Sequence, residues 1–469
     1  MTTAWQIIYD ALTRHGQAPV IERRGQWRSG AAILQAIAAR AEELAQLGLR
    51  PGQTALIVVS DNLVAIETLF ACWHMGASAG FVDFRAPAAR ITQMAARMQA
   101  ALVVGRRRVA GLDIAVQAAE AAMTDAPPLT LAKPEPEQTA IVFTSSGTTG
   151  EPRLRPSSQG KLGKSLDDFC RSEDHGKGGC LLGATSFAYS ASCNGWLRAL
   201  ASGKRIVALD LIYRLEELDA ALMRPDVTEC ALPPVLIRRL AALGDLEGGH
   251  RYPQLTRLGS VGGPAAPRDK IAALTRLSPQ YRMTYSCVGV GLVSRIGGEA
   301  LLARPASCGK PVADVRVRVL DGLSPCAVNQ IGTLEITNAF GATVRPGDLG
   351  WLDEDGYLYI AGRIEGLFCR NGVNFPAERL TQAALELPQV IAAAAIAQRD
   401  GDGGDVVHLF VQCPPSETDS VTRHLRQGLA AAEFPDHLHL RDNLPVTVSG
   451  KVDLGALSAY LGTSRGQGD

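Results

Sequence analysis

The sequence predicts an α/β fold, in which a large N-terminal domain of mixed, largely parallel sheets with a β-rich subdomain precedes a small α+β C-terminal domain. Three observations lead to this class. Short apolar runs alternate with amphipathic helical segments up to about residue 310. Short β segments punctuated by turns then follow, and the end of the chain mixes helices and strands. We therefore expect an N-terminal domain at 1–363 and a C-terminal domain at 364–469.

The first elements already show the alternation. Residues 31–47 have apolar positions at helical spacing and are followed by Gly48, which predicts a helix and its end. The apolar run 55–60 predicts a strand, Asp61 is placed to cap the next helix, and 79–83 predicts a second buried strand. Buried strands separated by helices favour a parallel sheet that is covered on both faces.

The later elements continue the pattern and then change it. Buried strands separated by helices come first, short strands between turns come next, and a mixed unit ends the chain. The expected segments are strands 205–209, 229–232 and 258–261, short strands 315–320, 332–337 and 357–360, helices 376–387 and 420–432, and strands 390–396 and 406–412.

Composition and charge exclude several classes of protein. The 469 residues include 47 Lys and Arg against 47 Asp and Glu, so the net charge is zero and nucleic acid is not the expected partner. The ten cysteines lack CxxC spacing, and no secretory signal pattern precedes them. The most apolar stretch, 63–82, contains Glu67 and His74. We expect a soluble, cytoplasmic protein with reduced thiols and no membrane span.

A loop rich in glycine and hydroxyl residues follows an apolar segment at 139–153, TAIVFTSSGTTGEPR. Glycines let the backbone approach a polyphosphate, N–H groups and hydroxyls donate hydrogen bonds to it, and Arg153 adds positive charge. The spacing and the lysine of the GxxxxGK[ST] loop are absent. Taken alone, the segment is equally well explained as a turn that joins two strands.

This loop resembles the phosphate-binding signature of the AMP-forming adenylate synthetases, the superfamily of acyl- and aryl-CoA ligases, peptide-synthetase adenylation domains and beetle luciferase. Four further segments match that family in the expected order: Gly262-Gly263-Pro264, Thr284-Tyr285-Ser286, GDLGWLDEDGYLYIAGR over 347–363 and LPVTVSGKVDLGAL over 444–457. The resemblance covers nearly the whole chain. It implies a mobile C-terminal domain that rotates about a hinge at Glu365 and Gly366 during catalysis.

The resemblance implies nucleotide-binding roles for residues that also have ordinary structural explanations. Asp348, expected at the end of a β segment before a polar turn, has two carboxylate oxygens for two ribose hydroxyls, but an aspartate there also caps turns. Tyr285 offers a ring for adenine or is a core tyrosine, and Arg363 contacts the ribose or is a surface arginine. The implied nucleotide-binding residues are Ser145, Ser146, Gly147, Thr149, Gly150, Gly262, Gly263, Tyr285, Asp348, Ile360 and Arg363.

The family reaction implies three catalytic residues. In that reaction a carboxylate attacks the α-phosphate of ATP, pyrophosphate leaves, and a thiol then attacks the acyl-AMP. Lys451 matches the lysine that reaches the acid and the α-phosphate, although most lysines near a chain end are merely solvated. Thr148 and Arg153 are implied to act from the phosphate loop. Mg²⁺ is expected with ATP, because the phosphates and the attacking carboxylate repel one another.

The sequence departs from the family after the adenine-binding tyrosine. The usual Tyr-Gly-x-Thr-Glu run is here YSCVG over 285–289, so Gly289 replaces the metal-binding glutamate. The metal ligands are left open between waters, phosphate oxygens and another acid such as Glu299. A nucleotide-binding relative with impaired catalysis is therefore an alternative. The segment 371–378 is also one residue shorter than usual, and Gly366 replaces a common aspartate, so the thiol path is undefined.

The acid is expected to lack an α-ammonium group. Peptide-synthetase domains carry Phe-Asp after the phosphate loop, whereas Ser190 is neutral here, and a buried ammonium without a carboxylate partner is disfavoured. An acyl or aryl acid is expected, with CoA as the thiol acceptor. A stand-alone enzyme that loads an acyl or amino acid onto a phosphopantetheinyl carrier protein is the alternative. Candidates for the acid pocket, each with a structural role as the alternative, are Tyr189, Ser190, Asn194 and Trp196.

Overall fold

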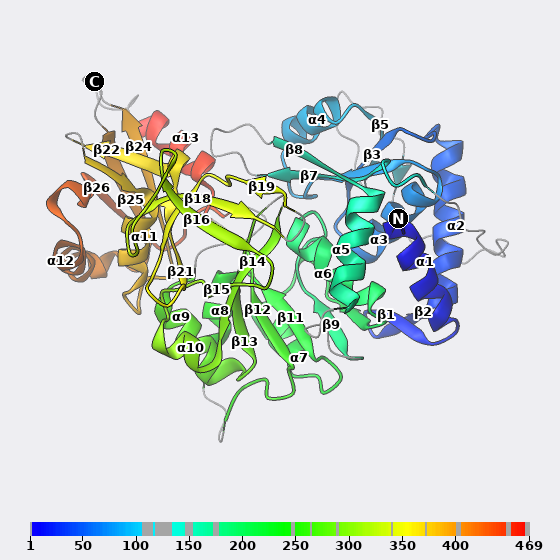
Figure 1. The fold of residues 1–469 in the computed structure, drawn as a ribbon, viewed down its shortest axis with the longest axis horizontal. Helices are drawn as coiled ribbons and strands as arrows, with labels where there is room; N and C mark the ends of the chain where they lie inside the picture. The colour runs from blue at the N-terminus through cyan, green and yellow to red at the C-terminus, as the bar shows by residue number, and fades with distance from the viewer. Residues whose placement is uncertain are drawn as a thin grey trace. The chain divides into compact units, whose positions relative to one another are not determined.

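The computed structural model describes residues 2–105, 116–117, 134–145, 153–171, 178–244, 249–262, 265–287, 290–338, 341–370, 373–399, 405–446 and 452–464 (Figure 1). By its backbone contacts the chain divides into two compact units. Of the described residues, those within 2–231 and 254–256 form the first unit, and those within 232–253 and 257–464 form the second.

The first sheet of the first unit has a parallel centre. Its strand order is β6-β5-β3-β4-β7-β8, in which β3 pairs in parallel with both β4 and β5, β4 pairs in parallel with β7, and β7 and β8 form an antiparallel hairpin. The strands are β3 (Thr54–Val58), β4 (Ser78–Phe81), β5 (Ala100–Gly105), β6 (Val116–Gln117), β7 (Thr139–Ser145) and β8 (Arg153–Ser158).

A second set of strands in this unit has the order β11-β9-β10-β1-β2. All neighbours pair in parallel except β1 and β2, which form an antiparallel hairpin. The strands are β1 (Pro19–Arg23), β2 (Gln26–Ser29), β9 (Cys180–Gly183), β10 (Arg205–Ala208) and β11 (Glu229–Leu232). The helices of the unit are α1 (Ala4–His15), α2 (Gly30–Gln46), α3 (Asn62–His74), α4 (Ala88–Arg97), α5 (Gln159–Arg171), α6 (Ser190–Ala201) and α7 (Leu215–Leu222).

One large apolar core unites these elements. It contains buried side chains of α1, α2, α3 and α6 together with side chains of strands from both sets, such as Ile57 of β3 and Ile206 of β10. Helix α3 is buried along almost its whole length, as its apolar sequence requires. Its cap is Asp61, whose carboxylate accepts hydrogen bonds from the backbone N–H groups of Leu63 and Val64 at 2.9 and 3.5 Å.

The second unit begins with a strand set that carries part of the candidate site. Strands β12 (Arg257–Ser260) and β13 (Tyr281–Cys287) are parallel, and β14 (Gly291–Gly297) pairs in antiparallel fashion with both β13 and β15 (Lys310–Pro311). The β13–β14 register shifts between Tyr285 and Ser286. Short helices accompany these strands: α8 (Pro234–Ala241), α9 (Pro267–Ala272), η2 (Ala273–Leu277) and α10 (Gly298–Ala303).

A β-rich subdomain follows, as predicted. Its strand order is β17-β16-β18-β20-β21, with β19 beside β18, and its pairs are antiparallel. The strands are β16 (Arg316–Asp321), β17 (Ser324–Pro325), β18 (Gly332–Thr337), β19 (Thr343–Val344), β20 (Asp348–Leu352) and β21 (Leu358–Arg363). The turn into β20 contains Gly347 at φ +84°, a conformation that favours glycine.

The last part of the chain has an apolar core of its own, built from buried residues such as Phe375, Leu380, Leu409 and Leu425. In its sheet β24 and β25 are antiparallel, and β25 and β26 are parallel. Its elements are η3 (Ile364–Gly366), β22 (Leu367–Arg370), β23 (Val373–Pro376), α11 (Ala377–Leu385), β24 (Ala392–Arg399), β25 (Asp405–Gln412), η4 (Pro415–Glu417), α12 (Thr418–Gly428), η5 (Ala431–Glu433), β26 (His437–Arg441) and α13 (Leu454–Ser464).

The fold class predicted from the sequence is confirmed, and the differences are local. Asp348 begins β20 rather than ending a β segment, because the chain turns at Gly347 just before it. The helix expected over 420–432 ends at Gly428, since Leu429 adopts an extended conformation. The domain boundary at 363/364 remains a prediction.

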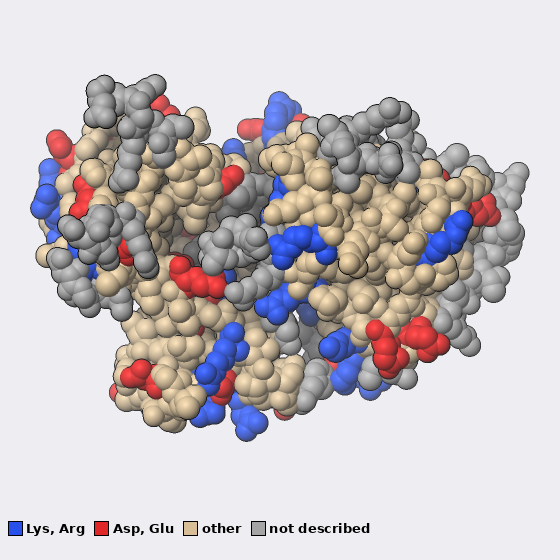
Figure 2. All heavy atoms as spheres, turned by 90° about the horizontal axis from the view of Figure 1, so that it is seen from above, with Lys and Arg blue, Asp and Glu red and all other residues tan. Residues whose placement is uncertain are grey.

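Three whole-chain features complete the description. All ten cysteines lie in described segments, and all are free thiols. In the part of the chain that the structure describes, no helix is long and apolar enough to cross a membrane. On the face drawn in Figure 2, basic and acidic side chains are interspersed, which agrees with the net charge of zero.

Candidate nucleotide site

Three predicted nucleotide-binding side chains meet in the second unit. Asp348 begins β20 and pairs in register with Arg363 at the end of β21. The Tyr285 hydroxyl donates a hydrogen bond to Oδ2 of Asp348, while Nε of Arg363 donates to Oδ1 at 2.9 Å. Nη2 of Arg363 also donates to the Pro346 carbonyl at 3.1 Å. The structure thus joins Tyr285, Asp348 and Arg363 in one hydrogen-bonded cluster.

Burial makes this cluster a defined polar site. The Asp348 side chain is 11% exposed, whereas the Arg363 side chain is 40% exposed. Burial and the adjacent Asp348 charge raise the pKa of Tyr285 well above its usual value, so the phenol stays neutral and donates its proton. Both carboxylate oxygens of Asp348 already accept one hydrogen bond each, and each keeps a further lone pair for a ligand hydroxyl.

Gly262 lies beside this cluster by register. The parallel register pairs Leu258 with Tyr281 and Ser260 with Met283. Two residues further along each strand direction, this register leads to Gly262 after β12 and to Tyr285 in β13. The carboxyl ends of neighbouring parallel strands are the usual place for ligands in such sheets. Gly262 has φ +89°, and a Cβ there would meet no atom within 4 Å, so the glycine serves the backbone turn and not a tight packing contact.

Ile360 packs in the apolar cluster that supports the tyrosine. That cluster contains buried Leu358 and Val293, with Tyr285, Cys287 and Ile360 packed against it. Ile360 is therefore an inward-facing strand residue that packs on the same cluster as Tyr285, and its predicted contact with a nucleotide stays a prediction. Burial, together with the Asp348 charge, raises the pKa of Cys287 to about 11, which keeps this thiol protonated.

The sequence prediction did not include Glu378, which the fold brings to the same place. A Cβ built on Gly362 would lie 2.5 Å from Oε2 of Glu378, and this oxygen has no hydrogen-bond partner. Burial raises the pKa of Glu378, against the opposing effects of backbone N–H groups and of Arg363. The sequence analysis considered segment 371–378 only for its length. Glu378 is the one acidic residue of this segment and lies near the start of an expected helix, which was the available signal.

The predicted hinge residues follow directly on the cluster. Glu365 and Gly366 form the short helix η3 after Arg363, and the backbone N–H of Ile364 donates to the Gly347 carbonyl at 2.9 Å. A Cβ on Gly366 would lie 3.8 Å from Oε2 of Glu378. Their role as a hinge stays a prediction.

The acid-pocket candidates lie on and before α6 in the first unit. Tyr189 is the N-cap residue of α6, and its hydroxyl donates to Oδ2 of Asp83 at 3.4 Å. Ser190 begins the helix, and Asn194 is half-buried on it. Trp196 is 1% exposed, so its position fits the structural alternative.

Trp196 packs in the core, and Asp83 lies beside Tyr189. The Trp196 ring packs edge-on against Phe187 at 5.9 Å, and a Cβ on Gly183 would lie 2.4 Å from it. Asp83, which the prediction omitted, is 8% exposed and pairs with Arg85. Its position just after the parallel strand β4 was the signal that could have found it.

Several predicted residues lie outside the described segments. These are Ser146, Gly147, Thr148, Thr149, Gly150, Gly263 and Lys451. Ser145 ends β7 and Arg153 begins β8, where they pair as opposite residues of the antiparallel hairpin. The segment between these residues therefore connects two paired strands, and its role as a phosphate loop stays a prediction.

The described residues provide no ready-made cage for a metal ion. Among them, no group of three His, Cys, Asp or Glu side chains is arranged to hold a cation. Glu299, the acid considered in place of Gly289, is exposed in the first turn of α10. The residues that fit a nucleotide are thus those for its nucleoside half.

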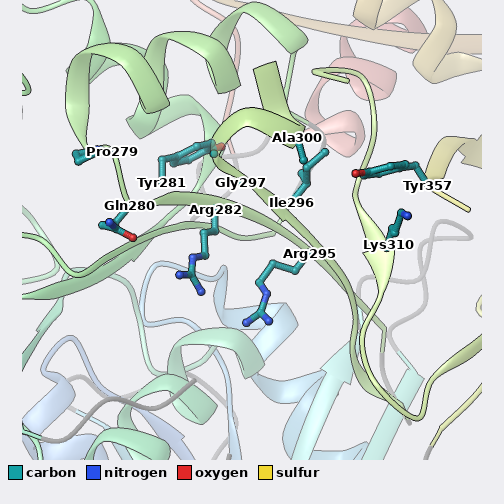
Figure 3. A pocket seen from close by; sticks show the side chains of 11 residues that line it. Pro279, Gln280, Tyr281, Arg282, Arg295, Ile296, Gly297, Ala300, Lys310 and Tyr357 are labelled. Carbon is teal, nitrogen blue, oxygen red and sulfur yellow. The ribbon is translucent and has the colours of Figure 1, made fainter. Parts of the chain in front are cut away.

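A separate cavity of about 570 Å³ lies at the start of β13. Its lining includes three cationic side chains and two tyrosines, but their polar ends do not converge. Figure 3 shows Arg282 and Arg295 pointing together to one side, whereas Lys310 turns toward the Tyr357 ring, 4.8 Å from its centroid. No predicted site residue lines this cavity, and we assign no ligand to it. The lining residues are Pro279, Gln280, Tyr281, Arg282, Arg295, Ile296, Gly297, Gly298, Ala300, Lys310 and Tyr357.

The whole fold is similar to those of two solved synthetases. An o-succinylbenzoate CoA synthetase from Bacillus subtilis, solved with its acyl-adenylate intermediate, has a TM-score of 0.83 at 17% identity and covers 97% of this chain and 98% of its own. The amide bond synthetase McbA from Marinactinospora thermotolerans has a TM-score of 0.80 at 19% identity, covering 97% and 99%. At these identities the likeness establishes the fold.

Two curated relatives align along much of the sequence. A 2-succinylbenzoate–CoA ligase of Geobacillus kaustophilus (strain HTA426) is 24% identical over 456 residues, 90% of this chain and 91% of that protein. A salicyl-AMP ligase/salicyl-S-ArCP synthetase of Mycobacterium tuberculosis (strain ATCC 25618 / H37Rv) is 28% identical over 370 residues, 71% and 63% of the respective chains.

Two family models match the chain. The model of the AMP-binding enzymes matches residues 8–343, and that of the AMP-binding enzyme C-terminal domain matches residues 380–451. The first match alone spans most of the chain and includes Tyr285, whereas Asp348 and Arg363 lie between the two matched ranges. The chain therefore belongs to the AMP-binding enzyme family.

Proposed function

We propose that this protein is an ATP-dependent, AMP-forming ligase that activates an aryl carboxylic acid and transfers it to a thiol, with CoA as the acceptor. The observation that carries the proposal is the Tyr285–Asp348–Arg363 cluster, a nucleoside-shaped set of groups in an AMP-binding enzyme. The names of the relatives, a succinylbenzoate ligase and a salicyl-AMP ligase, favour an aryl acid.

The nucleoside half of ATP has three partners in this proposal. The free lone pairs of Asp348 accept the two ribose hydroxyl protons, and Arg363 holds the carboxylate in place and balances its charge. The Tyr285 ring stacks on adenine, its orientation set by the hydroxyl bond to Asp348. Gly262 lets the backbone come close to the base.

Two displacement steps complete the reaction. A carboxylate oxygen of the acid attacks the α-phosphorus, the bond to the β-phosphate oxygen breaks, and pyrophosphate leaves. A thiolate then attacks the acyl carbon and AMP leaves. Lys451, Thr148 and Arg153 stabilise the charge on the phosphates and the acid in the first step. Mg²⁺ bound with ATP would be held mainly by phosphate oxygens and water, since the described residues form no metal site, and would supply positive charge to the phosphates.

The proposal also assigns a movement to the end of the chain. Residues 364–469 rotate about Glu365 and Gly366 between the two steps, so that Lys451 leaves the site before the thiol arrives. A domain with its own apolar core can move in this way without unfolding.

The test is ATP–pyrophosphate exchange with Mg²⁺ over a panel of substituted benzoates, short and long fatty acids, and α-amino acids. We expect exchange with one or more benzoates and none with amino acids. CoA, a phosphopantetheinylated carrier protein and a simple amine are then compared as acceptors of the adenylate. Faster transfer to the carrier protein than to CoA would show that the carrier protein, not CoA, is the acceptor.

A second candidate function is a nucleotide-binding relative that has lost chemistry. The specific observation that favours it is Gly289 in place of the metal-binding glutamate, with no three-residue metal group among the described residues. ATP binding by calorimetry without exchange for any acid would support this candidate and contradict the ligase proposal.

A further inference from the structure

Two arginines in the second unit bind backbone carbonyls that lie beyond the predicted hinge. Nη1 of Arg238, on α8, donates to the carbonyls of Val390 and Ile391 at 3.0 and 2.6 Å. Arg268, on α9, donates from Nη1 to the Glu386 carbonyl at 3.0 Å and from Nη2 to the Val390 carbonyl at 3.2 Å. The bonds therefore join the expected domain 1–363 to the expected domain 364–469.

One buried carboxylate prepares both arginines for this contact. Asp269, 6% exposed, accepts from Nε and Nη2 of Arg238 at 2.8 and 2.5 Å, and it lies 3.6 Å from Nε of Arg268. The Arg238 side chain is only 16% exposed. A guanidinium held by a carboxylate on one edge presents its remaining N–H groups in a fixed direction, at little further cost in side-chain entropy.

The acceptors are groups that need partners. The last carbonyls of an α-helix have no partner within the helix, and Glu386 is the C-cap residue of α11. Arg268 supplies a donor to the Glu386 carbonyl, and positive charge is favourable at the C-terminal end of a helix. Val390 is fully buried as a residue, and its carbonyl accepts from both arginines.

The chemistry of these bonds makes them reversible. The carboxylate that pairs with the arginines, Asp269, lies on α9 and not on the segment they hold, although Glu386 of that segment adds a Coulombic attraction to Arg268. Separation therefore leaves the Arg238–Asp269 ion pair intact and strands no buried charge, which would otherwise be strongly unfavourable. The freed carbonyls and N–H groups then form hydrogen bonds to water.

We propose that Arg238 and Arg268 form a latch, which holds residues 364–469 in the arrangement seen here and opens between the two half-reactions. Both are positioning residues, since they act through the placement of α11 and touch no reacting atom. The proposal rests on the proposed function for the order of the half-reactions, but the latch itself rests only on the contacts above. Loss of the latch shifts the balance of arrangements and therefore changes the two half-reactions in opposite directions.

The test uses the full chain with two variants that leave no buried charge unpaired. Arg268→Ala keeps the Arg238–Asp269 pair, and Arg238→Ala/Asp269→Ala removes both members of that pair together. The control is Arg239→Ala, the same loss of charge one residue along α8, where the side chain is exposed. Small-angle X-ray scattering of the ligand-free proteins and the rates of adenylation and of thioester formation from supplied acyl-AMP are measured.

For each latch variant we expect a larger radius of gyration from scattering, with a more heterogeneous population. We also expect the ratio of the two half-reaction rates to change by about tenfold or more, because two charge-assisted hydrogen bonds are lost. The control should match the wild type in both measurements. Scattering curves that superimpose on the wild type, or a rate ratio that stays within about twofold, would overturn the latch. If no acid supports exchange in the wild type, the function fails, and scattering still decides whether the latch exists.

Discussion

Replacing Asp348 by Asn changes the charge of the nucleotide cluster with almost no change in volume. The amide oxygen can still accept from Arg363, and the amide nitrogen can face the Tyr285 oxygen, so the cluster keeps its internal hydrogen bonds. The amide has lost one acceptor, however, so one of the two ribose hydroxyls no longer has an acceptor and the other meets a neutral oxygen in place of a charged one. The perturbation therefore acts on ATP binding more than on folding.

The expected magnitude follows from these contacts. A hydrogen bond to a charged group contributes about 1.5–3 kcal/mol. Loss of one such bond, about 2 kcal/mol, weakens ATP binding about thirtyfold. The free energy of unfolding should fall by less than about 1 kcal/mol, because Arg363 is 40% exposed and its ion pair is partly screened.

Isothermal titration calorimetry with ATP and with 2′,3′-dideoxy-ATP provides the assay. The wild type should prefer ATP, and Asp348→Asn should lose much of that preference, because the effects of removing the carboxylate and the hydroxyls are not additive when the groups touch. Glu354→Gln, an exposed acid in the next turn, is the matched control and should behave as the wild type. Equal discrimination between the two nucleotides by Asp348→Asn and the wild type would refute the ribose contact.

Three further predictions concern catalysis, pH and the packing at Gly362. Lys451→Ala should abolish ATP–pyrophosphate exchange yet spare thioester formation from supplied acyl-AMP, and undiminished exchange would contradict its role. Burial raises the pKa of Glu67 from 4.5 to about 7. The free energy of unfolding should therefore fall by about 3 kcal/mol in all as the pH rises through this range. In urea titrations at pH 4.5–7.5, Glu67→Gln should show a flatter pH dependence of this free energy. Gly362→Ala should lower the free energy of unfolding, measured by urea titration, by about 1–3 kcal/mol, because its Cβ would lie 2.5 Å from Oε2 of Glu378 and its φ is +154°. Adding Glu378→Ala to this variant should restore part of the lost free energy. A Gly362→Ala variant as stable as the wild type would show that the backbone yields there.

Local patterns predicted most of the elements. Strand β11 (Glu229–Leu232) and strand β18 (Gly332–Thr337) have the predicted bounds, and Asp61 caps α3 as expected. These features depend on residues within a few positions of one another, so periodicity and capping chemistry are sufficient to find them. The end of an element depends on more than this local pattern: α12 stops at Gly428 because Leu429 adopts an extended backbone conformation.

The candidate site shows the same division. The motifs identified Tyr285, Asp348 and Arg363 one at a time, each with an ordinary alternative. Sequence spacing alone does not say that Tyr285 and Asp348 share a hydrogen bond, because that contact depends on where two different sheets place their strand ends. Glu378 was missed for the same reason.

By itself, the sequence determined the α/β class, the order of the elements, the family and the chemical types of the nucleotide partners, since all of these are recorded in local periodicity and in short motifs. Only the tertiary structure decided which side chains meet. It placed Trp196 in the core, brought Glu378 against Gly362, and joined Arg238 and Arg268 to carbonyls more than a hundred residues away. The physical reason is that packing and hydrogen bonding act between neighbours in space, whatever their separation along the chain.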